Sequence, residues 1–463
     1  MKNVGSTRVV LYSLNYADRV LTEIPYVRYS GERSLCYLED LRQDENNLII
    51  ITQAPVEPYA LKYHYRDLYR FNDQQIKSAN ERLTLLSPRS HESLPLDALV
   101  LADDEIMCRL EEEVKLGREV SIANFSASPQ VEQIASVLGA NLDEPDSRLS
   151  SRWGGKYGGK EIFLRSGIAM PPGDAQLLMD EASVVAAIHQ LALRDRPGPA
   201  RKAMIKLNDS SWGGAIGNAL IDCQRLVRTG DLRDSVELVG QPWNDFVQEI
   251  SRGGAIVEEY IQDVTSSPSG IGQITADGSV RVRATHDQIV SSGQYWGCRF
   301  PASEKWRREI IQAIKQVGQT LAELGLRGTF GVDFVTSITG EIFAVELNLR
   351  KVGPSHVLNY VESLVGSPVD LHSMPQQEGS TVHYVHRRLL QPEILRGQQP
   401  RAVVERMRRA GLLYQHDTGE GVVLHMLGAL SACGYVELTS ITTSDEVANA
   451  ISEAAQEVTL HSR

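Results

Sequence analysis

The sequence predicts an α/β N-terminal domain, an α+β middle region and a small C-terminal domain or extension. In the first third, short β-branched runs at 8–14, 47–52, 98–101 and 120–124 alternate with helical stretches, which is typical of a parallel α/β layer. The middle region instead mixes amphipathic helices with hairpin signals. We place the three parts at residues 1–145, 146–375 and 376–463.

The elements that follow are indicated by turn residues and by hydrophobic spacing. Gly139 closes a short helical stretch at 130–138 as a C-terminal cap. Asp277-Gly278 lies between two alternating segments, which predicts a hairpin. From Trp306 to Leu324, apolar residues recur three or four positions apart, which predicts a helix with one buried face. In the last part, helices are expected near 401–410 and 444–458, on either side of the apolar run 421–430.

Composition and charge exclude several classes of protein. The 463 residues, 42% of them hydrophobic, suffice for two to four domains with their own cores. A net charge of −12 disfavours a surface built to bind nucleic acid. The five cysteines are odd in number and far apart, so they indicate neither a disulfide framework nor a metal knuckle. With no secretory leader or membrane-spanning run, we expect a cytoplasmic protein whose partners are neither nucleic acid nor membrane.

The strongest candidate for chemistry is a pair of strand-like runs on either side of Thr339-Gly340. A hairpin centred there places Asp333 directly opposite Glu346. Facing carboxylates have Cβ atoms about 4.5–5.5 Å apart and destabilise the strand pair unless a cation lies between them. Asn348 falls on the same face, and three such oxygens suit Mg²⁺ whose shell is completed by substrate phosphates. The alternative is a half-exposed strand pair whose acids face water.

A second candidate combines a lysine with a loop rich in serine and glycine. A predicted strand ends near Lys206, and the loop after it includes Ser211, Gly213 and Gly214, whose backbone N–H groups could surround phosphate oxygens. Glycine-rich hairpin turns with a nearby lysine are also common, so the pattern alone leaves both interpretations open.

The segment 154–161 nearly matches the P-loop string and is rejected as one. Glu161 stands where a Mg²⁺-binding Ser or Thr is required, and no buried strand precedes the segment. Lys156 and Lys160 remain candidate phosphate lysines. Further on, the apolar run at 255–257 ends in Glu258, Glu259, Tyr260 and Ile261, whose backbone could meet an adenine edge, or could be a plain strand end.

Taken in order, these pieces resemble the ATP-grasp superfamily. The resemblance implies a nucleotide held between two α+β lobes that follow a Rossmann-like N-terminal domain. It implies that ATP phosphates contact Lys156 and Lys206, and that the adenine hinge is Glu258, Glu259, Tyr260 and Ile261. It further implies that Asp333, Glu346 and Asn348 hold Mg²⁺, and that Arg350 lies beside the transferred phosphate.

Over its whole length the chain is similar to the family of peptide ligases that acts in pheganomycin biosynthesis. The similarity rests on 267–269, 285–288, 297–302 and 421–429. It implies an ATP-dependent ligase that joins a carboxylate to an amine of amino acids or peptides through an acyl phosphate, in natural-product biosynthesis. Val352 and Pro354 depart from the family pattern close to where substrate should bind. The alternatives are a small-molecule kinase of the same fold, or an ATP-binding protein without turnover.

Three further residues complete the expected site. His286 and His356 are candidate general bases, although a lone histidine is more often structural. Arg327 could bind a substrate carboxylate and is otherwise a surface arginine. The expected catalytic set is therefore Arg350, Lys206, Arg327 and His286. The substrates and a homodimeric state stay open.

Overall fold

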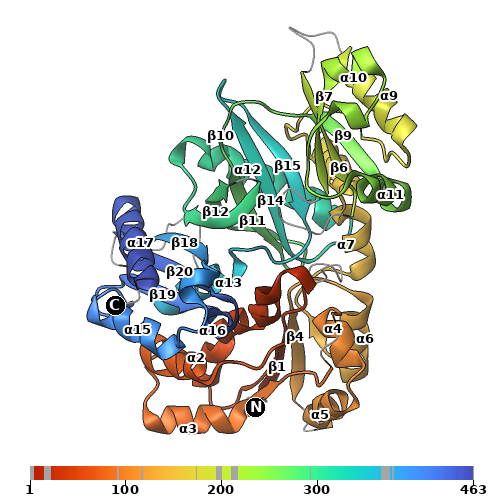
Figure 1. The fold of residues 1–463 in the computed structure, drawn as a ribbon. Coiled ribbons are helices and arrows are strands. Elements are labelled where there is room, and N and C mark those ends of the chain that lie inside the picture. The colour runs from red at the N-terminus through yellow and green to blue at the C-terminus, as the bar shows by residue number, and fades with distance from the viewer. Residues whose placement is uncertain are drawn as a thin grey trace. The chain divides into compact units, whose positions relative to one another are not determined.

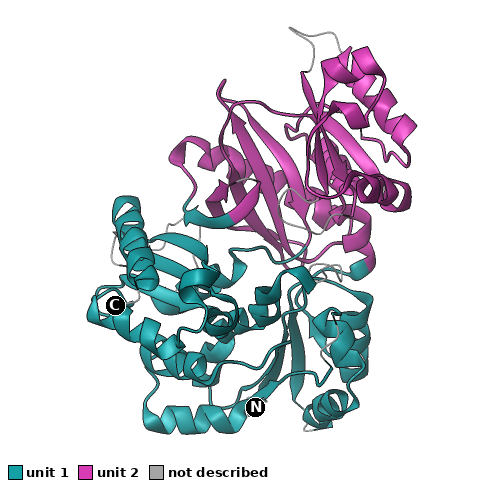
Figure 2. Ribbon diagram, in the orientation of Figure 1, with its two compact units in different colours: residues 1–147, 296–301, 350–463 teal, residues 148–295, 302–349 magenta. Residues whose placement is uncertain are grey.

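The protein forms two compact units in the computed structural model (Figures 1 and 2). Unit 1 comprises Met1–Ser147, Trp296–Pro301 and Arg350–Arg463, and unit 2 comprises Arg148–Tyr295 and Ala302–Leu349. The structure describes residues 5–14, 22–90, 93–115, 118–173, 175–193, 201–209, 217–291, 293–366, 376–377 and 380–461. The sequence-based third part, 376–463, thus belongs to the same unit as the first 147 residues.

The N-terminal half of unit 1 is built on a parallel five-stranded sheet with strand order β3-β2-β1-β4-β5. Its strands are β1 (Ser6–Leu11), β2 (Asn47–Ile51), β3 (Leu83–Leu86), β4 (Glu119–Asn124) and β5 (Asn141–Leu142). The predicted parallel α/β layer is therefore confirmed. The strand expected at 98–101 is wrong, because these residues lie in helix α4 (Leu96–Leu101), which starts after Pro95 and carries Asp97 in its first turn.

Helical segments cover this sheet. They are η1 (Pro25–Arg42, a 3-10 helix), α2 (Pro58–Tyr63), the π-helical turn η2 (His64–Leu68), α3 (Asp73–Arg82), α4, α5 (Asp104–Lys115) and α6 (Pro129–Leu138). Helix α6 begins with the Ser128 side chain accepting the Val131 N–H, and it ends at Gly139 with φ of 60°, so the predicted cap is confirmed. Val9, Ile106 and Ile134 belong to the apolar core between these layers.

The C-terminal half of unit 1 is an antiparallel sheet. Strand β20 (Tyr435–Thr442) lies between β18 (His383–Leu390) and β19 (Gly421–His425), and residues 297–300 of β13 (Gln294–Phe300) pair with β18. The associated elements are α13 (Ser355–Val365), β16 (Gln376–Gln377), β17 (Ser380–Thr381), α14 (Pro392–Leu395), α15 (Pro400–Arg409), α16 (Leu427–Cys433) and α17 (Asp445–Leu460). Both helices predicted in this part, near 401–410 and 444–458, are confirmed.

Unit 2 contains a four-stranded antiparallel sheet and a second group of strands. The first has the order β8-β7-β6-β9, from β6 (Lys202–Leu207), β7 (Asn218–Asp222), β8 (Val236–Val239) and β9 (Ala255–Glu259). Its helical segments are α9 (Glu181–Ala192), α10 (Cys223–Thr229), η3 (Arg233–Ser235) and α11 (Trp243–Gly253). Val184, Ile205, Ile221 and Phe246 pack in the core of this part.

The second group of strands carries the predicted carboxylates. It includes β10 (Val264–Ser266), β11 (Pro268–Ile274), β12 (Val280–Ser291), β14 (Gly328–Ser337) and β15 (Ile342–Asn348), with α7 (Ser147–Gly154), α8 (Lys156–Ser166) and α12 (Glu304–Glu323). Helix α12 lies against β11 and β12 (Figure 1) because Gly270 leaves room, as a Cβ there would lie 2.6 Å from Ile314. The hairpin at Asp277-Gly278 and the helix from Trp306 are confirmed.

None of the helices within the described ranges is both long enough and apolar enough to cross a membrane.

A buried histidine in unit 1 predicts acid sensitivity. His64 contacts the Ala60 carbonyl oxygen at 2.7 Å and the Tyr360 hydroxyl at 2.7 Å, and burial lowers its pKa to about 4. The unfolded chain therefore binds the proton first, so the stability that His64 contributes is present above pH 6.5 and is lost as the pH falls towards 4. Denaturation between pH 7 and pH 4 should show the free energy of unfolding falling by up to about 1.4 kcal/mol per pH unit for such a group.

The matched control for this prediction is the exposed His461. His64→Gln should reduce the pH slope of the unfolding free energy, whereas His461→Gln should leave it unchanged. A slope that is the same in wild type and His64→Gln would contradict the prediction.

Candidate active site

Strands β14 and β15 bring the two predicted carboxylates together. Asp333 and Glu346 are direct partners in the antiparallel register, as predicted, and the amide of Asn348 donates to Asp333 Oδ2 at 3.1 Å, so Asn348 lies on the same face. The register shifts immediately beyond this pair, where Phe334 faces Ala344 and Val345 forms a bulge. The uniform register predicted along the hairpin is therefore wrong past Asp333. Bulges are frequent next to active sites, because they turn backbone groups out of the ladder.

Amide donors partly offset the repulsion between the two acids. Gln288 Nε2, from β12, donates to Asp333 Oδ1 at 2.6 Å, and Asn348 donates to the other oxygen. Both acids remain partly exposed, while Asn348 is buried. The donor set is thus two carboxylates and one amide oxygen on one strand face, which fits Mg²⁺ or another hard divalent ion that retains open positions for phosphate.

Lys156 is the first residue of helix α8 and reaches Glu346. Its Nζ lies 2.6 Å from Glu346 Oε1, and the side chain is only 10% exposed. Asn208, from the segment after β6, fixes the start of this helix, because its side-chain oxygen accepts the Tyr157 N–H at 3.0 Å and its carbonyl accepts the Lys156 N–H at 3.0 Å. The helix start and its lysine are thereby held beside the carboxylates.

Glu258 lies between two lysines in the interior of unit 2. Its Oε2 is 3.4 Å from Lys160 Nζ, and its Oε1 accepts a hydrogen bond from Lys206 Nζ. Lys206 also donates to the carbonyl of Val345 at 3.1 Å, which is the residue that the bulge turns outward. One carboxylate therefore positions two ammonium groups, and Lys206 connects strand β6 with the strand that carries Glu346.

In the expected adenine hinge, two backbone N–H groups are already hydrogen-bonded within the protein. Glu258 turns its side chain to the lysines, the N–H of Glu259 donates to the Pro172 carbonyl at 2.7 Å, and the N–H of Tyr260 donates to the Lys202 carbonyl at 3.1 Å. An adenine edge would therefore have to use other backbone groups of this segment, such as those of Ile261.

Of the predicted catalytic residues, His286 lies one strand away from Asp333, whereas Arg327 lies far from the cluster. His286, on β12, pairs with Ser269 of β11, and Ser269 pairs on its other side with Asp333 of β14. Burial lowers the pKa of His286 to about 3, so its ring is neutral. Arg327 donates to the carbonyls of Ala276, Ala322 and Leu326, about 20 Å along the strand from Asp333, and supports a turn there.

The remaining predicted residues are Arg350 and the three residues of the serine- and glycine-rich loop. Arg350 belongs to unit 1, where its guanidinium lies 5.7 Å from the centre of the Phe125 ring. Ser211, Gly213 and Gly214 lie outside the described residues.

Sequence reasoning missed two residues that the geometry reveals. Gln288 lies in the segment 285–288, for which the sequence predicts no role, yet its side-chain amide donates directly to Asp333. Asn208 lies at the start of the segment that follows Lys206 and is not among the predicted site residues, yet it caps the helix that carries Lys156. One signal could have identified Gln288. It lies two residues after His286, and residues two apart on a strand share the same face.

In unit 1, the buried Glu437 lies with two histidines at distances that would suit a metal ion, but its other contacts indicate a structural role. The ligand atoms of His356, His386 and Glu437 lie within 4.8 Å of one another. Glu437 is already bound by Arg33 Nη2 at 2.6 Å and by Arg388 Nε at 3.3 Å. Two guanidiniums around one carboxylate leave an excess of positive charge, which disfavours a further cation. This also makes His356 a structural group, since its Nε2 lies 3.2 Å from Glu437.

Comparison with known families agrees with this geometry. Residues 235–354, which include the hinge and both carboxylates, match the ATP-grasp domain, and residues 402–455 match the PGM1 C-terminal domain. Two solved structures share the fold over 98% of this chain, each at 13% identity. One is N5-carboxyaminoimidazole ribonucleotide synthetase with ADP (98% of that chain, TM-score 0.57), and the other is the biotin carboxylase–β,γ-ATP complex from Campylobacter jejuni (91%, TM-score 0.59).

A curated relative is much more similar in sequence. The L-propargylglycine–L-glutamate ligase of Streptantibioticus cattleyicolor is 50% identical over 457 residues, which are 98% of this chain and 94% of that protein. The fold class and the family resemblance predicted from the sequence are confirmed by these matches. The chain therefore belongs to the ATP-grasp family, among the ligases that include this propargylglycine–glutamate enzyme.

Proposed function

We propose that the protein joins the carboxylate of one amino acid or peptide to the amine of another at the expense of ATP, through an acyl phosphate. The observation that carries the proposal is the facing pair Asp333 and Glu346, with Lys156 at 2.6 Å from Glu346. Phosphoryl transfer needs positioning and positive charge around the moving group more than it needs a covalent protein intermediate. The cluster of unit 2 provides such charge.

The roles follow from the contacts of each side chain. Asp333, Glu346 and Asn348 would hold Mg²⁺, which when bound neutralises charge on the phosphate oxygens. Lys156 and Lys206 would exchange their present carboxylate and carbonyl partners for phosphate oxygens. Glu258 keeps Lys206 and Lys160 in place, which makes it a positioning residue. Arg350 is the proposed partner of the transferred phosphate. His286, which is fully buried and has its pKa lowered to about 3, is too weak a base to take up a proton from an amine near neutral pH.

The substrates we propose are amino acids or short peptides, in natural-product biosynthesis. The 50% identical relative is named for two amino acids, one with a small unsaturated side chain and one with a second carboxylate. The departures at Val352 and Pro354 leave room for a different pair here. None of the five cysteines, all of which lie within the described residues, forms a disulfide, which fits the reducing cytoplasm that we propose. A homodimer belongs to the same proposal.

The test is a screen for phosphate release from ATP with amino acids and short peptides, singly and in pairs, followed by mass measurement of the product. A ligase should release phosphate only when both a carboxylate and an amine substrate are present. A stable phosphorylated product without free phosphate would identify a kinase instead. Binding of ATP with no release of ADP in any pair would leave only a nucleotide-binding protein.

Lys206 should contribute to ATP binding and to phosphoryl transfer together. Lys206→Met removes a charge that lies beside Glu258 and Val345, so kcat/KM for ATP should fall by about 10–100-fold, in line with the loss of a charge-assisted contact worth about 1.5–3 kcal/mol. Steady-state kinetics with varied ATP measures this.

The matched control is Lys202, on the same strand four residues earlier. Its side chain pairs with Glu237 and is about one third exposed, so Lys202→Met should keep kcat/KM close to wild type. Equal losses in the two variants would show that the effect of Lys206 is not specific to its place in the cluster.

A further inference from the structure

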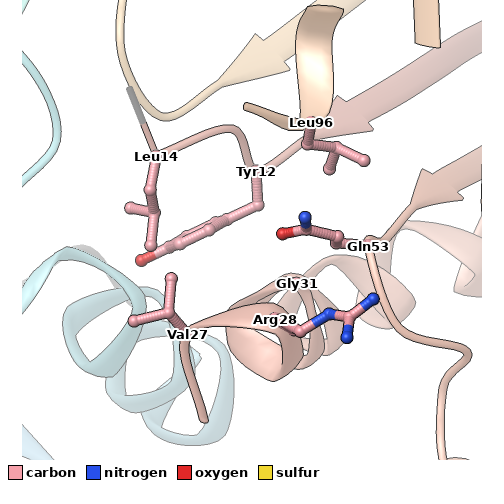
Figure 3. Close-up of a pocket in the computed structure, with 7 residues that line it drawn as sticks. All are labelled: Tyr12, Leu14, Val27, Arg28, Gly31, Gln53 and Leu96. Atoms are coloured by element: carbon pink, nitrogen blue, oxygen red, sulfur yellow. The ribbon is translucent and has the colours of Figure 1, made fainter. Parts of the chain in front are cut away.

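The hollow beyond the carboxyl ends of β1 and β2, in unit 1, is too small to hold a substrate. The residues that line it are Tyr12, Leu14, Val27, Arg28, Gly31, Gln53 and Leu96 (Figure 3). The space inside it that is open to water is about 10 Å³. One water molecule needs about 10–15 Å³ on this measure, so the hollow has room for about one water molecule and not for an amino acid.

In unit 2, the side chain of Gln288 contacts a carboxylate of the proposed metal site from a separate strand. Its Nε2 donates to Asp333 Oδ1 at 2.6 Å, and the side chain is partly buried. The backbone N–H of Gln288 donates to the Ser267 carbonyl at 3.0 Å, which fixes the residue beside the start of β11. Since β11 lies between β12 and β14, the amide of Gln288 reaches across this strand to Asp333.

Asp333 is held from both sides by amide groups. Gln288 donates to Oδ1, and Asn348 donates to Oδ2 at 3.1 Å. A carboxylate oxygen has two lone pairs, so each oxygen can accept one amide hydrogen bond and still bind a cation. Carboxylates that bind metal ions are commonly oriented by such hydrogen bonds from residues behind them. Gln288 and Asn348 together thus fix the orientation in which Asp333 faces Glu346.

The neutrality of the Gln288 amide matters as much as its hydrogen bond. Glu346 already lies 2.6 Å from the ammonium of Lys156, so one positive charge is present beside the two acids. An ammonium at position 288 would also pair with Asp333 and would leave the acids with no net negative charge to attract a divalent cation. A glutamine orients the carboxylate as a lysine could, but it does not compete with the ion.

We infer that Gln288 is a positioning residue for Mg²⁺: it orients Asp333 with a neutral hydrogen bond and so leaves the charge of this carboxylate to the ion. The inference rests on the proposed function, because Asp333, Glu346 and Asn348 hold Mg²⁺ there. It adds a residue from a third strand to the site, and it states which property of the side chain is required.

Calorimetric titration of the full chain with the β,γ-methylene analogue of ATP tests the inference without any turnover. The Kd is measured with Mg²⁺ and again with EDTA, and we call the ratio of the second value to the first the Mg²⁺ gain. Gln288→Leu, which removes the donor, should lower the Mg²⁺ gain about tenfold, the usual loss when a residue behind a metal ligand is removed. Gln288→Lys should lower it about a hundredfold, because the ammonium also competes with the ion.

The melting temperature in EDTA separates this role from a purely structural hydrogen bond. Gln288→Lys keeps a donor to Asp333 and adds an opposite charge, so its melting temperature should equal or exceed that of wild type while its Mg²⁺ gain falls. If Gln288 only supported the sheet, Gln288→Lys would keep both quantities. Gln319, exposed on α12 of the same unit, is the matched control, and Gln319→Leu and Gln319→Lys should change neither quantity.

Asp333→Asn separates this inference from the proposed function. If Asp333→Asn loses the Mg²⁺ gain while Gln288→Leu or Gln288→Lys keeps the wild-type value, the role of Gln288 is overturned and the metal site stands. If the Mg²⁺ gain of wild type is no larger than that of Asp333→Asn, the metal site in the proposed function is overturned instead.

Discussion

Asp333→Asn should lower phosphate release by about a thousand-fold while the protein stays folded. Metal ions stabilise transition-state charge by several kcal/mol, and each 1.36 kcal/mol corresponds to tenfold in rate. Asp333 faces Glu346 and is the acceptor for Gln288 and Asn348, so its loss removes half of the charge of the donor set. The fold should persist, because a neutral amide opposite Glu346 also removes the repulsion between two acids.

The measurement has two parts. Phosphate release is followed while Mg²⁺ is varied, and the variant should need much more Mg²⁺ for half of its own maximal rate. The melting temperature without Mg²⁺ should stay equal to that of wild type or rise. Asp245→Asn, at an exposed site on α11, is the control and should change neither quantity. Near-normal turnover of Asp333→Asn at limiting Mg²⁺ would show that the facing carboxylates do not hold the ion.

The pairing of the two carboxylates was predicted correctly, although the register beside the turn was not. Next to the turn Thr336 pairs with Ile342, one residue out of the predicted register, and the bulge at Val345 then brings Asp333 opposite Glu346. The bulge at Val345 could not be predicted in this way, because it follows from contacts outside the hairpin. The carbonyl of Val345 accepts from Lys206 on β6, 139 residues earlier in the chain. Local sequence patterns do not predict a contact between residues so far apart in the chain.

The partner of Lys156 could not be predicted from the sequence for the same reason. Lys156 and Glu346 are separated by 190 residues, and no pattern in either segment names the other. The alternation in the first third predicted a parallel sheet, yet it misplaced one strand, since a short apolar run such as 98–101 cannot be assigned to a strand or a helix by periodicity alone. The proline and the acid at the start of α4 and the helix-favouring alanine and leucines of 98–101 distinguish the helix.

The C-terminal part could be predicted from the sequence only in its local structure. Its helices follow from hydrophobic spacing, but its association with the N-terminal half depends on single long-range pairs. Arg33, in η1, bonds Glu437, on β20, over 404 residues. This carboxylate also accepts the Tyr435 hydroxyl at 2.5 Å and lies 3.2 Å from His356. The sequence contains no signal for such a buried centre, because each residue taken alone is ordinary.

Glu437→Gln should destabilise the protein by about 3–5 kcal/mol, the usual cost of removing one partner from a buried ion pair. Glu437 and Arg33 are almost fully buried, and Arg388 contributes a second guanidinium, so the neutral amide would leave two buried positive charges without their acid. Those charges hold the pKa of the Glu437 carboxyl well below its usual value, so the carboxyl is ionised at neutral pH. Urea denaturation followed by circular dichroism measures the loss.

A double-mutant cycle separates the ion pair from the general effect of substituting a buried residue. Arg33→Met should also be costly, and the combination of Arg33→Met with Glu437→Gln should cost less than the sum of the two, because the first change removes one of the charges that the second leaves unpaired. Glu457→Gln, at an exposed position on α17, should be neutral. Strict additivity of the two buried substitutions would mean that the coupling between Arg33 and Glu437 contributes nothing to the stability of unit 1.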